Sequence, residues 1–485
     1  MKRLSVLVLA LAVLAVSHAA IRLPHVLGDG MVLQQWTSVR LWGWATPGST
    51  VTVKTSWNVG KIYVAKTQKD GKWQTTVPTP AATNTLQTII VTEGKTSKVT
   101  LRNVLIGEVW VCAGQSNMEF PLKGFNNCPL KDYNDVVSEA SRYDGIRFVK
   151  IPSVKSSTPL DDAQCQWKAA NVDNVADCSA VGYFFARQLR QALGIPVGLI
   201  LANKGGSRVE SWLDKANLEA HTQEPLDSME IVRRFPQDWV MPLLWGNGTF
   251  HPILNYTVKG IIFYQGCSNV GAPGNQYSDR LALLVNQWRR DFGEGNIPFY
   301  FVQLAPYCDG DGPDGTSRAY LEEQQLRAAD IIPNCGVICA NDCVYPWEAH
   351  QIHPCNKKPV GDRLGWLALE KTYGKCNYQA ESPRFDRMFV QGDTCFVRLK
   401  NTYGGISRQS GIEGFEVAGS DKVFHKAVAG QFWVPSNDPR NECIYVVSPE
   451  VKAPVAVRYC FRNFQIGNLH GNNDLPLFPF RTDNW

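Results

Sequence analysis

The alternation of apolar and polar residues along the chain changes character at two places. Between residues 31 and 103, short stretches alternate with a period of two, as in Val39-Arg40-Leu41-Trp42, and Asp70-Gly71 is a hairpin signal. Short strands separated by turns are typical of a small β-sandwich. We therefore expect an N-terminal segment and a β-sandwich-like domain over residues 21–103.

Buried strands and amphipathic helices alternate over residues 104–384. The predicted strands cover residues 105–111, 197–202, 259–264, 299–304 and 335–339. The predicted helices cover residues 179–193, 277–292 and 320–329. This alternation predicts an α/β domain with a parallel sheet. After residue 384 the segments are again short and β-rich, so we expect a C-terminal β-rich domain over 385–485.

The first 20 residues have the features of a secretory signal peptide. Lys2 and Arg3 precede a mostly apolar run from Leu4 to Val16 that is too short to cross a bilayer. We therefore expect a secreted or lysosomal protein without a membrane partner. Loss of the two basic residues lowers the formal charge from +5 to about +3, which argues against a nucleic-acid partner.

A secreted chain with fourteen cysteines is expected to form disulfide bonds, although their pairing does not follow from the sequence. Buried free thiols are the alternative for Cys112 and Cys178, which lie in apolar stretches. Asn247 and Asn255 each begin an Asn-x-Thr sequon. Behind a signal peptide, both are predicted glycosylation sites.

Two patterns resemble metal ligands, and neither is complete. Cys335, Cys339 and Cys343 recur every four residues, but no partner set completes a site. His350 and His353 are close in sequence, but flanking prolines argue against a long helix that would present them together. We expect neither a metal nor an organic cofactor.

A serine and a distant histidine carry the candidate chemistry. Ser116 stands in the motif Gly-Gln-Ser-Asn-Met at 114–118, directly after a predicted strand, and His353 stands in Ile-His-Pro at 352–354. A serine becomes a nucleophile when a base takes its proton, so the pair predicts acyl transfer. Taken alone, the serine fits a turn or a helix cap, and the histidine fits a structural role. Met118 replaces the second glycine of a Gly-x-Ser-x-Gly elbow, which indicates a different hydrolase architecture.

Two further segments follow predicted strands. Gly205 and Gly206 would let backbone N–H groups approach a ligand closely, as an oxyanion site requires. Asn269, in the segment Gln-Gly-Cys-Ser-Asn at 265–269, would present its amide at the same edge of the sheet. A plain turn is the alternative for the glycines, and an Asx-type turn is the alternative for Asn269.

The four segments together resemble the sequence blocks of SGNH-type hydrolases, most closely those of the sialate O-acetylesterase family. The similarity extends to the Gly-Met-Val-Leu-Gln motif at 30–34 and to the Pro-Phe-Arg-Thr-Asp motif at 479–483. The resemblance implies an α/β, flavodoxin-like three-layer hydrolase domain with accessory β-rich domains. It also implies a serine carboxylesterase that removes O-acetyl groups from sugars.

The substrate implied first is 9-O-acetyl sialic acid, either free or on a glycan. An esterase of acetyl-xylan or another acetylated glycan is the first alternative, and a catalytically inactive sugar-binding protein is the second. The expected catalytic residues are Ser116 as nucleophile, His353 as general base, and Gly205, Gly206 and Asn269 as oxyanion donors. The expected substrate contacts are Gln115, Arg208 and Gln265, with Arg208 facing the sugar carboxylate.

The chain departs from the family in two places. Many relatives carry an acid two or three residues before the histidine, where this chain has Gln351 and His350. Either a Ser–His dyad operates, or Glu348 or Asp342 replaces that acid. Cys267 stands where relatives usually carry glutamate, which removes one support expected for Asn269.

Overall fold

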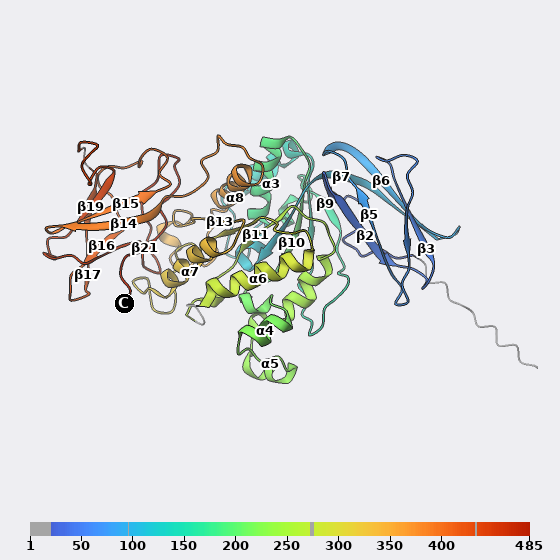
Figure 1. The fold of residues 1–485 in the computed structure, drawn as a ribbon, viewed down its shortest axis with the longest axis horizontal. Helices are drawn as coiled ribbons and strands as arrows, with labels where there is room; N and C mark the ends of the chain where they lie inside the picture. Colours follow the sequence, from blue (N-terminus) through green and yellow to red (C-terminus); the bar gives the residue numbers. More distant parts are fainter. Residues whose placement is uncertain (1–20, 96, 272–275, 432–433) are drawn as a thin grey trace, which may run out of the picture.

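Three regions follow one another in chain order in the computed structural model (Figure 1). The structure describes residues 21–95, 97–271, 276–431 and 434–485, so the predicted signal peptide lies outside the described residues. An N-terminal β region and a C-terminal β region lie at opposite ends, and an α/β region lies between them.

The N-terminal region consists of antiparallel strands, apart from β1, which pairs in parallel with β7. Strand β2 pairs with β5, and the turn between β4 and β5 contains Gly71, whose φ of +83° suits glycine. Strand β3 pairs with β4 and β6, and β6 in turn pairs with β7. The strands are β1 (Val32–Gln34), β2 (Ser38–Trp44), β3 (Thr50–Thr55), β4 (Tyr63–Lys66), β5 (Lys72–Pro78) and β6 (Thr83–Glu93).

Strand β7 (Ser97–Gly114) runs without a break from the N-terminal region into the α/β region. Its first half pairs with β6, and its second half pairs with two strands of the central sheet. The predicted domain boundary at 103/104 therefore falls inside one strand. The change of pattern marks where β7 becomes buried on both faces, because residues 104–114 are all buried.

The central sheet has the order β13-β12-β11-β7-β10-β8-β9. All of these strands are parallel except β9, which is antiparallel to β8. The five strands β10-β7-β11-β12-β13 have the flavodoxin order 2-1-3-4-5, and β8 and β9 extend one edge. The strands are β8 (Ile146–Lys150), β9 (Trp167–Ala169), β10 (Val197–Asn203), β11 (Gly260–Tyr264), β12 (Phe299–Val302) and β13 (Cys335–Ile338).

Helices cover both faces of this sheet. Helices α3 (Ala180–Leu193) and α8 (Lys358–Lys371) lie on one face, and α6 (Tyr277–Phe292) and α7 (Ser317–Ile331) lie on the other (Figure 1). The helices α3 and α8 pack closely, because a Cβ atom at Gly361 would lie only 2.5 Å from Cβ of Phe184. The predicted three-layer α/β fold is confirmed.

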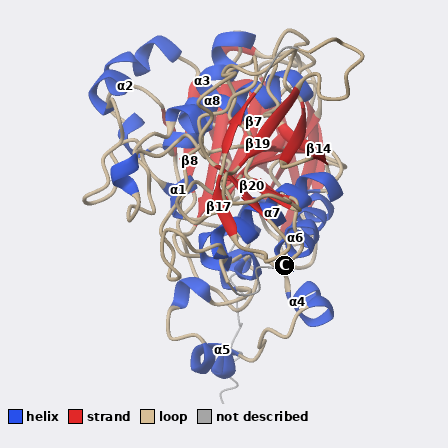
Figure 2. Ribbon diagram, turned by 90° about the vertical axis from the view of Figure 1, so that its left-hand side faces the viewer, coloured by secondary structure: helices blue, strands red, loops and turns tan. Residues whose placement is uncertain are grey.

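Two short helices stand apart from the layered body. Helices α4 (Lys215–His221) and α5 (Ser228–Arg234) project from the α/β region below the sheet (Figure 2). Each begins at an aspartate whose side chain accepts backbone N–H bonds, Asp214 for α4 and Asp227 for α5. The segment that carries them returns to the turn after β10, where Trp239 lies against Gly206.

The C-terminal region contains two four-stranded antiparallel sheets around a core of their own. It starts at Arg384, one residue before the predicted boundary. One sheet consists of β14 (Arg384–Gln391), β15 (Thr394–Lys400), β19 (Cys443–Val447) and β18 (Val428–Gly430). The other consists of β17 (Phe424–Lys426), β16 (Phe415–Ala418), β20 (Ala456–Tyr459) and β21 (Phe480–Arg481).

The predicted disulfide bonds are not confirmed. All fourteen cysteines are unpaired in the structure, and many of them, including Cys112 and Cys178, are buried in the core. The described residues hold no group of three His, Cys, Asp or Glu side chains arranged to bind a metal. No helix in the described part of the chain is both long and apolar enough to span a membrane.

The two sequons lie in different surroundings. Asn247 is 8% exposed within the helical turn Gly246–Phe250, and Thr249 is fully buried, with its hydroxyl accepting the N–H of Val154. Asn247 is therefore nearly buried, where the sequon predicted a surface loop, and its glycosylation stays a prediction. Asn255 is exposed, as a glycosylation site requires.

Candidate active site

Ser116 lies at the carboxyl end of β7, where β10 and β11 flank the central strand. Gly114 has a φ of +138°, and a Cβ atom there would lie 2.3 Å from the carbonyl oxygen of Tyr264. Glycine therefore lets β7 and β11 approach each other just before the chain turns. The four-residue helix α1 (Ser116–Glu119) begins at the serine, at the crevice where open α/β sheets bind ligands.

The two glutamines of the motifs tie neighbouring turns together. The Gln115 side-chain oxygen accepts the N–H of Gly266 at 2.8 Å, and the Gln265 amide donates to the carbonyl oxygen of Ser207 at 3.0 Å. Gln115 is 2% exposed and Gln265 is 1% exposed. Both side chains serve the fold here, and the contacts with substrate expected for them stay predictions.

Gly205 lies directly beside the nucleophile. A Cβ atom at Gly205 would lie 3.5 Å from Cβ of Ser116. The Gly205 N–H donates to Glu119 Oε2 at 2.8 Å, so this carboxylate occupies a donor that was expected to face an oxyanion. Sequence reasoning missed Glu119, although it directly follows the motif at 114–118. The N–H groups of Ser116 and Gly206 make no hydrogen bond within the described chain, which leaves two backbone donors open beside the serine.

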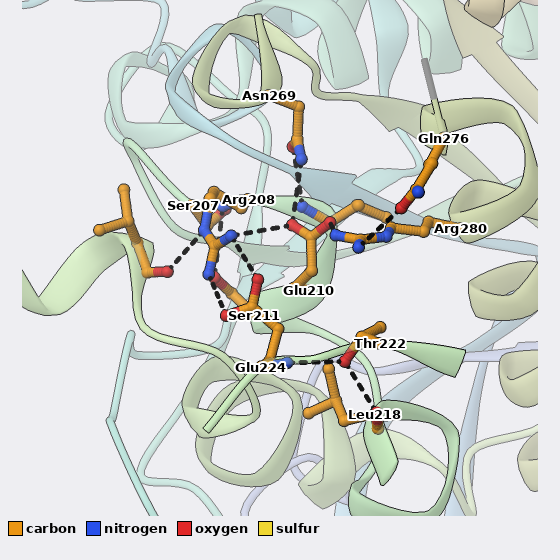
Figure 3. A network of polar contacts seen from close by, with 12 residues as sticks. Ser207, Arg208, Glu210, Ser211, Leu218, Thr222, Glu224, Asn269, Gln276 and Arg280 are labelled. Carbon is orange, nitrogen blue, oxygen red and sulfur yellow. Dashed lines mark hydrogen bonds and ion pairs between the residues drawn. The ribbon is translucent and has the colours of Figure 1, made fainter. Parts of the chain in front are cut away.

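Asn269 is completely buried and fixed at both ends of its amide. Its nitrogen donates to Glu210 Oε2 at 3.0 Å, and its oxygen accepts the Val209 N–H at 3.0 Å and the Gln265 amide at 2.8 Å. Asn269 is therefore well supported despite the cysteine at position 267. Its amide points at Glu210 (Figure 3), and its expected action on an oxyanion stays a prediction.

Arg208 is held by acidic residues of the protein. Its guanidinium forms two hydrogen bonds to Glu224, at 2.7 and 2.9 Å, and lies 3.6 Å from Glu210 (Figure 3). Its Nε donates to the carbonyl oxygen of Val240 at 2.8 Å. Burial lowers the pKa of Arg208, but these bonds and charges outweigh burial and raise it. A substrate carboxylate would have to compete with Glu224, so the expected contact of Arg208 with sugar also stays a prediction.

Glu210 is the centre of this buried network. Its carboxylate accepts hydrogen bonds from Arg280 and Asn269 and faces Arg208 (Figure 3). Arg280 in turn donates to Gln276 at 3.0 Å. No sequence signal identified Glu210, because an acid four residues after Gly206 is equally common in an exposed turn.

The histidine segment docks on α1. The Asn117 amide donates to the carbonyl oxygen of Ile352 at 3.0 Å, and Lys357 Nζ donates to the Asn117 oxygen at 2.5 Å. These bonds join the neighbours of Ser116 and His353, so the structure brings the two segments together. His353 Nε2 is buried and has no hydrogen-bond partner in the described chain. Catalytic hydrogen bonds are often long in the free enzyme and tighten with substrate.

Neither of the acids considered for the triad contacts His353. Asp342 binds Arg363 through both oxygens, each at 2.6 Å, and lies 3.4 Å from His470. Glu348 accepts the backbone N–H groups of Tyr345 and Cys355, each at 2.9 Å. The geometry therefore favours the dyad among the arrangements considered from sequence.

The surroundings of His353 are apolar and positively charged. Phe125 packs edge-on against the imidazole, with ring centres 5.2 Å apart, and Phe120 lies at 6.5 Å. Burial and then the charge of Lys357 lower the pKa of His353 to about 4. Burial also lowers the pKa of Lys357 to about 8. The imidazole is therefore neutral near pH 7 and able to accept a proton.

Comparison with known proteins identifies the family of the chain. Residues 106–365 match the family model for carbohydrate esterases of the sialic acid-specific acetylesterase type. Sialate O-acetylesterase from Homo sapiens is 28% identical over 397 residues, which cover 75% of this chain and 73% of that protein. The enzyme of that name from Mus musculus is 26% identical over 407 residues, 73% of this chain and 74% of that protein.

A solved structure resembles the whole chain. A carbohydrate acetylesterase from Xanthomonas citri has 32% sequence identity and a TM-score of 0.83, and the match covers 96% of this chain and 100% of that one. The similarity therefore includes the accessory β regions as well as the α/β domain. The chain belongs to the sialic acid-specific acetylesterase family of carbohydrate esterases and is a carboxylic ester hydrolase.

Proposed function

We propose that the protein removes O-acetyl groups from sugars through Ser116 and His353, and that 9-O-acetylated sialic acid is its substrate. One observation carries the mechanism. A partly exposed serine begins α1 beside two open backbone N–H groups, and the histidine of the segment docked on α1 has an unpaired Nε2 that is not protonated near pH 7. These are the parts that acyl transfer needs.

In the first half-reaction, Ser116 Oγ attacks the acetyl carbonyl carbon while His353 Nε2 takes its proton. The N–H groups of Ser116 and Gly206 stabilise the oxyanion of the tetrahedral intermediate. The intermediate collapses, and the departing sugar hydroxyl receives the proton from His353. In the second half-reaction, His353 activates water, which hydrolyses the acetyl-enzyme and releases acetate.

Acetate release tests the mechanism directly. We expect Ser116→Ala to lower kcat on p-nitrophenyl acetate by at least about 10³-fold, because it removes the nucleophile. The variant Asn269→Ala tests whether Asn269 acts on the oxyanion. If it does, kcat should fall about 10²-fold, as it does on loss of an oxyanion donor. Failure of the wild-type protein to release acetate above the level of Ser116→Ala would refute the esterase mechanism and leave a sugar-binding role.

Positive charge at the same sheet edge supports an acidic sugar. Lys150 ends β8, which is two strands from β7, or about 10 Å at the usual strand spacing. It lines a cavity of about 870 Å³ together with Lys123 and Lys168, which pair with Asp177 at 2.8 and 3.4 Å, and Lys150 itself lies 3.9 Å from Glu119. Lys204, which follows β10, stacks on Trp245 at 4.5 Å and forms no ion pair within the described residues.

Parallel assays test the substrate. We expect a higher kcat/KM on 9-O-acetyl sialic acid than on acetylated xylan. Lys150→Met and Lys204→Met should raise KM for the acidic sugar about five- to tenfold, as loss of a charge-assisted contact does. Both variants should leave hydrolysis of p-nitrophenyl acetate unchanged, and the exposed Lys452→Met serves as a control for loss of one charge. A higher kcat/KM on acetylated xylan, with KM unchanged in both lysine variants, would favour an esterase of acetyl-xylan or another acetylated glycan.

We also propose that the protein passes through the secretory pathway and carries a glycan at Asn255. The basic and apolar N-terminus and the exposed sequon support this. Expression in a secreting host should give a protein whose mass falls by one glycan in Asn255→Gln and does not fall in Asn247→Gln. Retention of the unprocessed chain in the cytosol would contradict the proposal.

A further inference from the structure

Cys128 lies beside the ring nitrogen Nδ1 of His353. Cys128 Sγ is 3.9 Å from His353 Nδ1, and the cysteine is only 8% exposed. Sulfur is a weak acceptor, but water has little access to this place. No carboxylate contacts His353 in the described chain, since Asp342 and Glu348 are bound elsewhere. The thiol is therefore the polar group that faces Nδ1.

Gln351 determines which way the thiol hydrogen points. The Gln351 side-chain oxygen accepts the backbone N–H of His353 at 3.2 Å, and its nitrogen donates to the carbonyl oxygen of Asn127 at 3.4 Å. These two bonds fix the orientation of the amide. Its oxygen then lies 3.2 Å from Cys128 Sγ. A carbonyl oxygen can only accept, so the thiol must donate to Gln351.

We propose that Cys128, oriented by Gln351, is the positioning residue that fixes the tautomer of His353. Because the thiol hydrogen is directed to Gln351, the sulfur faces Nδ1 as an acceptor, and Nδ1 carries the ring hydrogen. The lone pair of the neutral imidazole is then on Nε2, the atom that must take the proton of Ser116. This inference rests on the proposed role of His353 as general base.

A short hairpin holds Cys128 in place. The backbone N–H groups of Phe125 and Cys128 each donate to the other's carbonyl oxygen at 3.0 Å. Gly124 permits this approach, since its φ is +74° and a Cβ atom there would lie 2.3 Å from the Cys128 carbonyl oxygen. The same hairpin places Phe125 edge-on against His353. One segment therefore supplies both the aromatic wall and the thiol.

A neutral thiol can orient the imidazole of His353, but it carries no charge to stabilise the imidazolium cation. The groups that face His353 are Phe120, which follows α1, and Phe125 and Cys128 of the hairpin. The charged group that acts on it is Lys357. A carboxylate in such a place is worth about 10⁴-fold in kcat, largely through the tautomer. Loss of the weaker thiol should therefore cost less than loss of a triad acid.

Kinetics on p-nitrophenyl acetate give the first test. We expect Cys128→Ala to lower kcat about five- to tenfold, the rate equivalent of one neutral hydrogen bond, with KM within about twofold of wild type. Cys128→Ser, which can still donate to Gln351 and accept from Nδ1, should recover most of this loss. The matched control is Cys395→Ala, which removes another buried thiol from β15 and should leave kcat unchanged. Wild-type kcat in Cys128→Ala would overturn the proposal.

Two further measurements would stay unchanged if Cys128 had only a structural role. Nitrogen-15 NMR of the histidine rings, with His353→Gln used to assign the signal, should show hydrogen on Nδ1 in the wild type and a tautomer mixture in Cys128→Ala. Cys128→Asp should move the acid limb of kcat/KM upward by about one pH unit or more, because a carboxylate stabilises the imidazolium. Hydrogen on Nε2 in the wild type would overturn the proposal. The NMR result is independent of activity, so failure of the proposed function can be told from failure of this inference.

Discussion

Two groups of polar side chains flank Ser116, and they differ in how completely they are satisfied. On one side, Glu210, Arg208 and Arg280 form a buried network in which opposite charges meet. On the other side, His353 packs against aromatic rings, and its Nε2 has no partner in the described chain. Arg280 Nε has no partner in the described chain, but opposite charges in the network still stabilise a single geometry. The imidazole nitrogen, on the segment that docks on α1, is available to accept a proton. The comparison separates the residues that hold the site from those that act in it.

Glu210→Gln should have the largest effect, because it removes the central charge of the buried network. Removal of one charge from a buried ion pair leaves Arg280 uncompensated, and we expect a loss of about 3–5 kcal/mol in the free energy of unfolding. Urea unfolding followed by fluorescence measures it. Glu230→Gln, in an exposed ion pair, is the matched control. Equal stability of Glu210→Gln and the wild type would show that the network does not hold the edge of the site.

Gly206→Ala tests the open turn beside the serine. Gly206 has a φ of +76°, and a Cβ atom there would lie 2.3 Å from Trp239 Cδ1, so alanine must displace the indole or the turn. We expect kcat to fall about 10- to 100-fold as the Gly206 N–H leaves its position, somewhat less than complete loss of an oxyanion donor.

Gly48→Ala controls for backbone strain in that experiment. Gly48 also has a φ of +76°, but nothing lies within 4 Å of an added Cβ atom. This variant should lose a little stability and keep the wild-type kcat. Equal activity of both variants would show that the turn at Gly206 has no part in the chemistry.

Lys357→Met tests why the base stays neutral. The charge of Lys357 helps to lower the pKa of His353, so its removal should raise that pKa from about 4 toward the ordinary value. Because the neutral imidazole is the active form, the acid limb of kcat/KM should move to higher pH by up to about one unit. The exposed Lys375→Met should leave the limb in place. An unmoved limb in Lys357→Met would assign the low pKa to burial alone.

Arg233→Ala should have the smallest effect. Arg233 pairs with Glu230 at 2.6 Å on the surface of α5, in a geometry as good as that of many buried pairs. Water screens this pair, so we expect an unchanged Tm and an unchanged kcat. A clear fall in Tm would show that α5 contributes more to the fold than its exposed position indicates.

Much of the fold followed from local periodicity. The strand before Ser116 and the helix ending at Leu193 were predicted close to their observed ends, because each buries a continuous face. The continuity of β7 was not predicted, since its two halves bury different surfaces and so show different patterns. The disulfide bonds were expected from composition alone. Composition does not show whether two cysteines lie close enough in the fold to form a bond.

The site was only partly accessible to sequence reasoning. Ser116 and His353 were found from motifs, and the structure places their segments side by side. Glu119 and Cys128 were missed, because their roles depend on contacts with Gly205 and Gln351 that exist only in the folded chain. A motif names the reacting atoms, while the groups that orient them come from tertiary packing.

Strand β7 also couples the unfolding of the N-terminal region to that of the α/β region. It begins against β6 in the N-terminal region and ends at the nucleophile, so pulling or melting the N-terminal sheet acts on the backbone that carries Ser116. The two regions should therefore unfold in one cooperative transition. A chain that begins at residue 104 would start in the middle of β7 and lose catalysis together with its accessory domain. The N-terminal region therefore supports the backbone that carries the nucleophile.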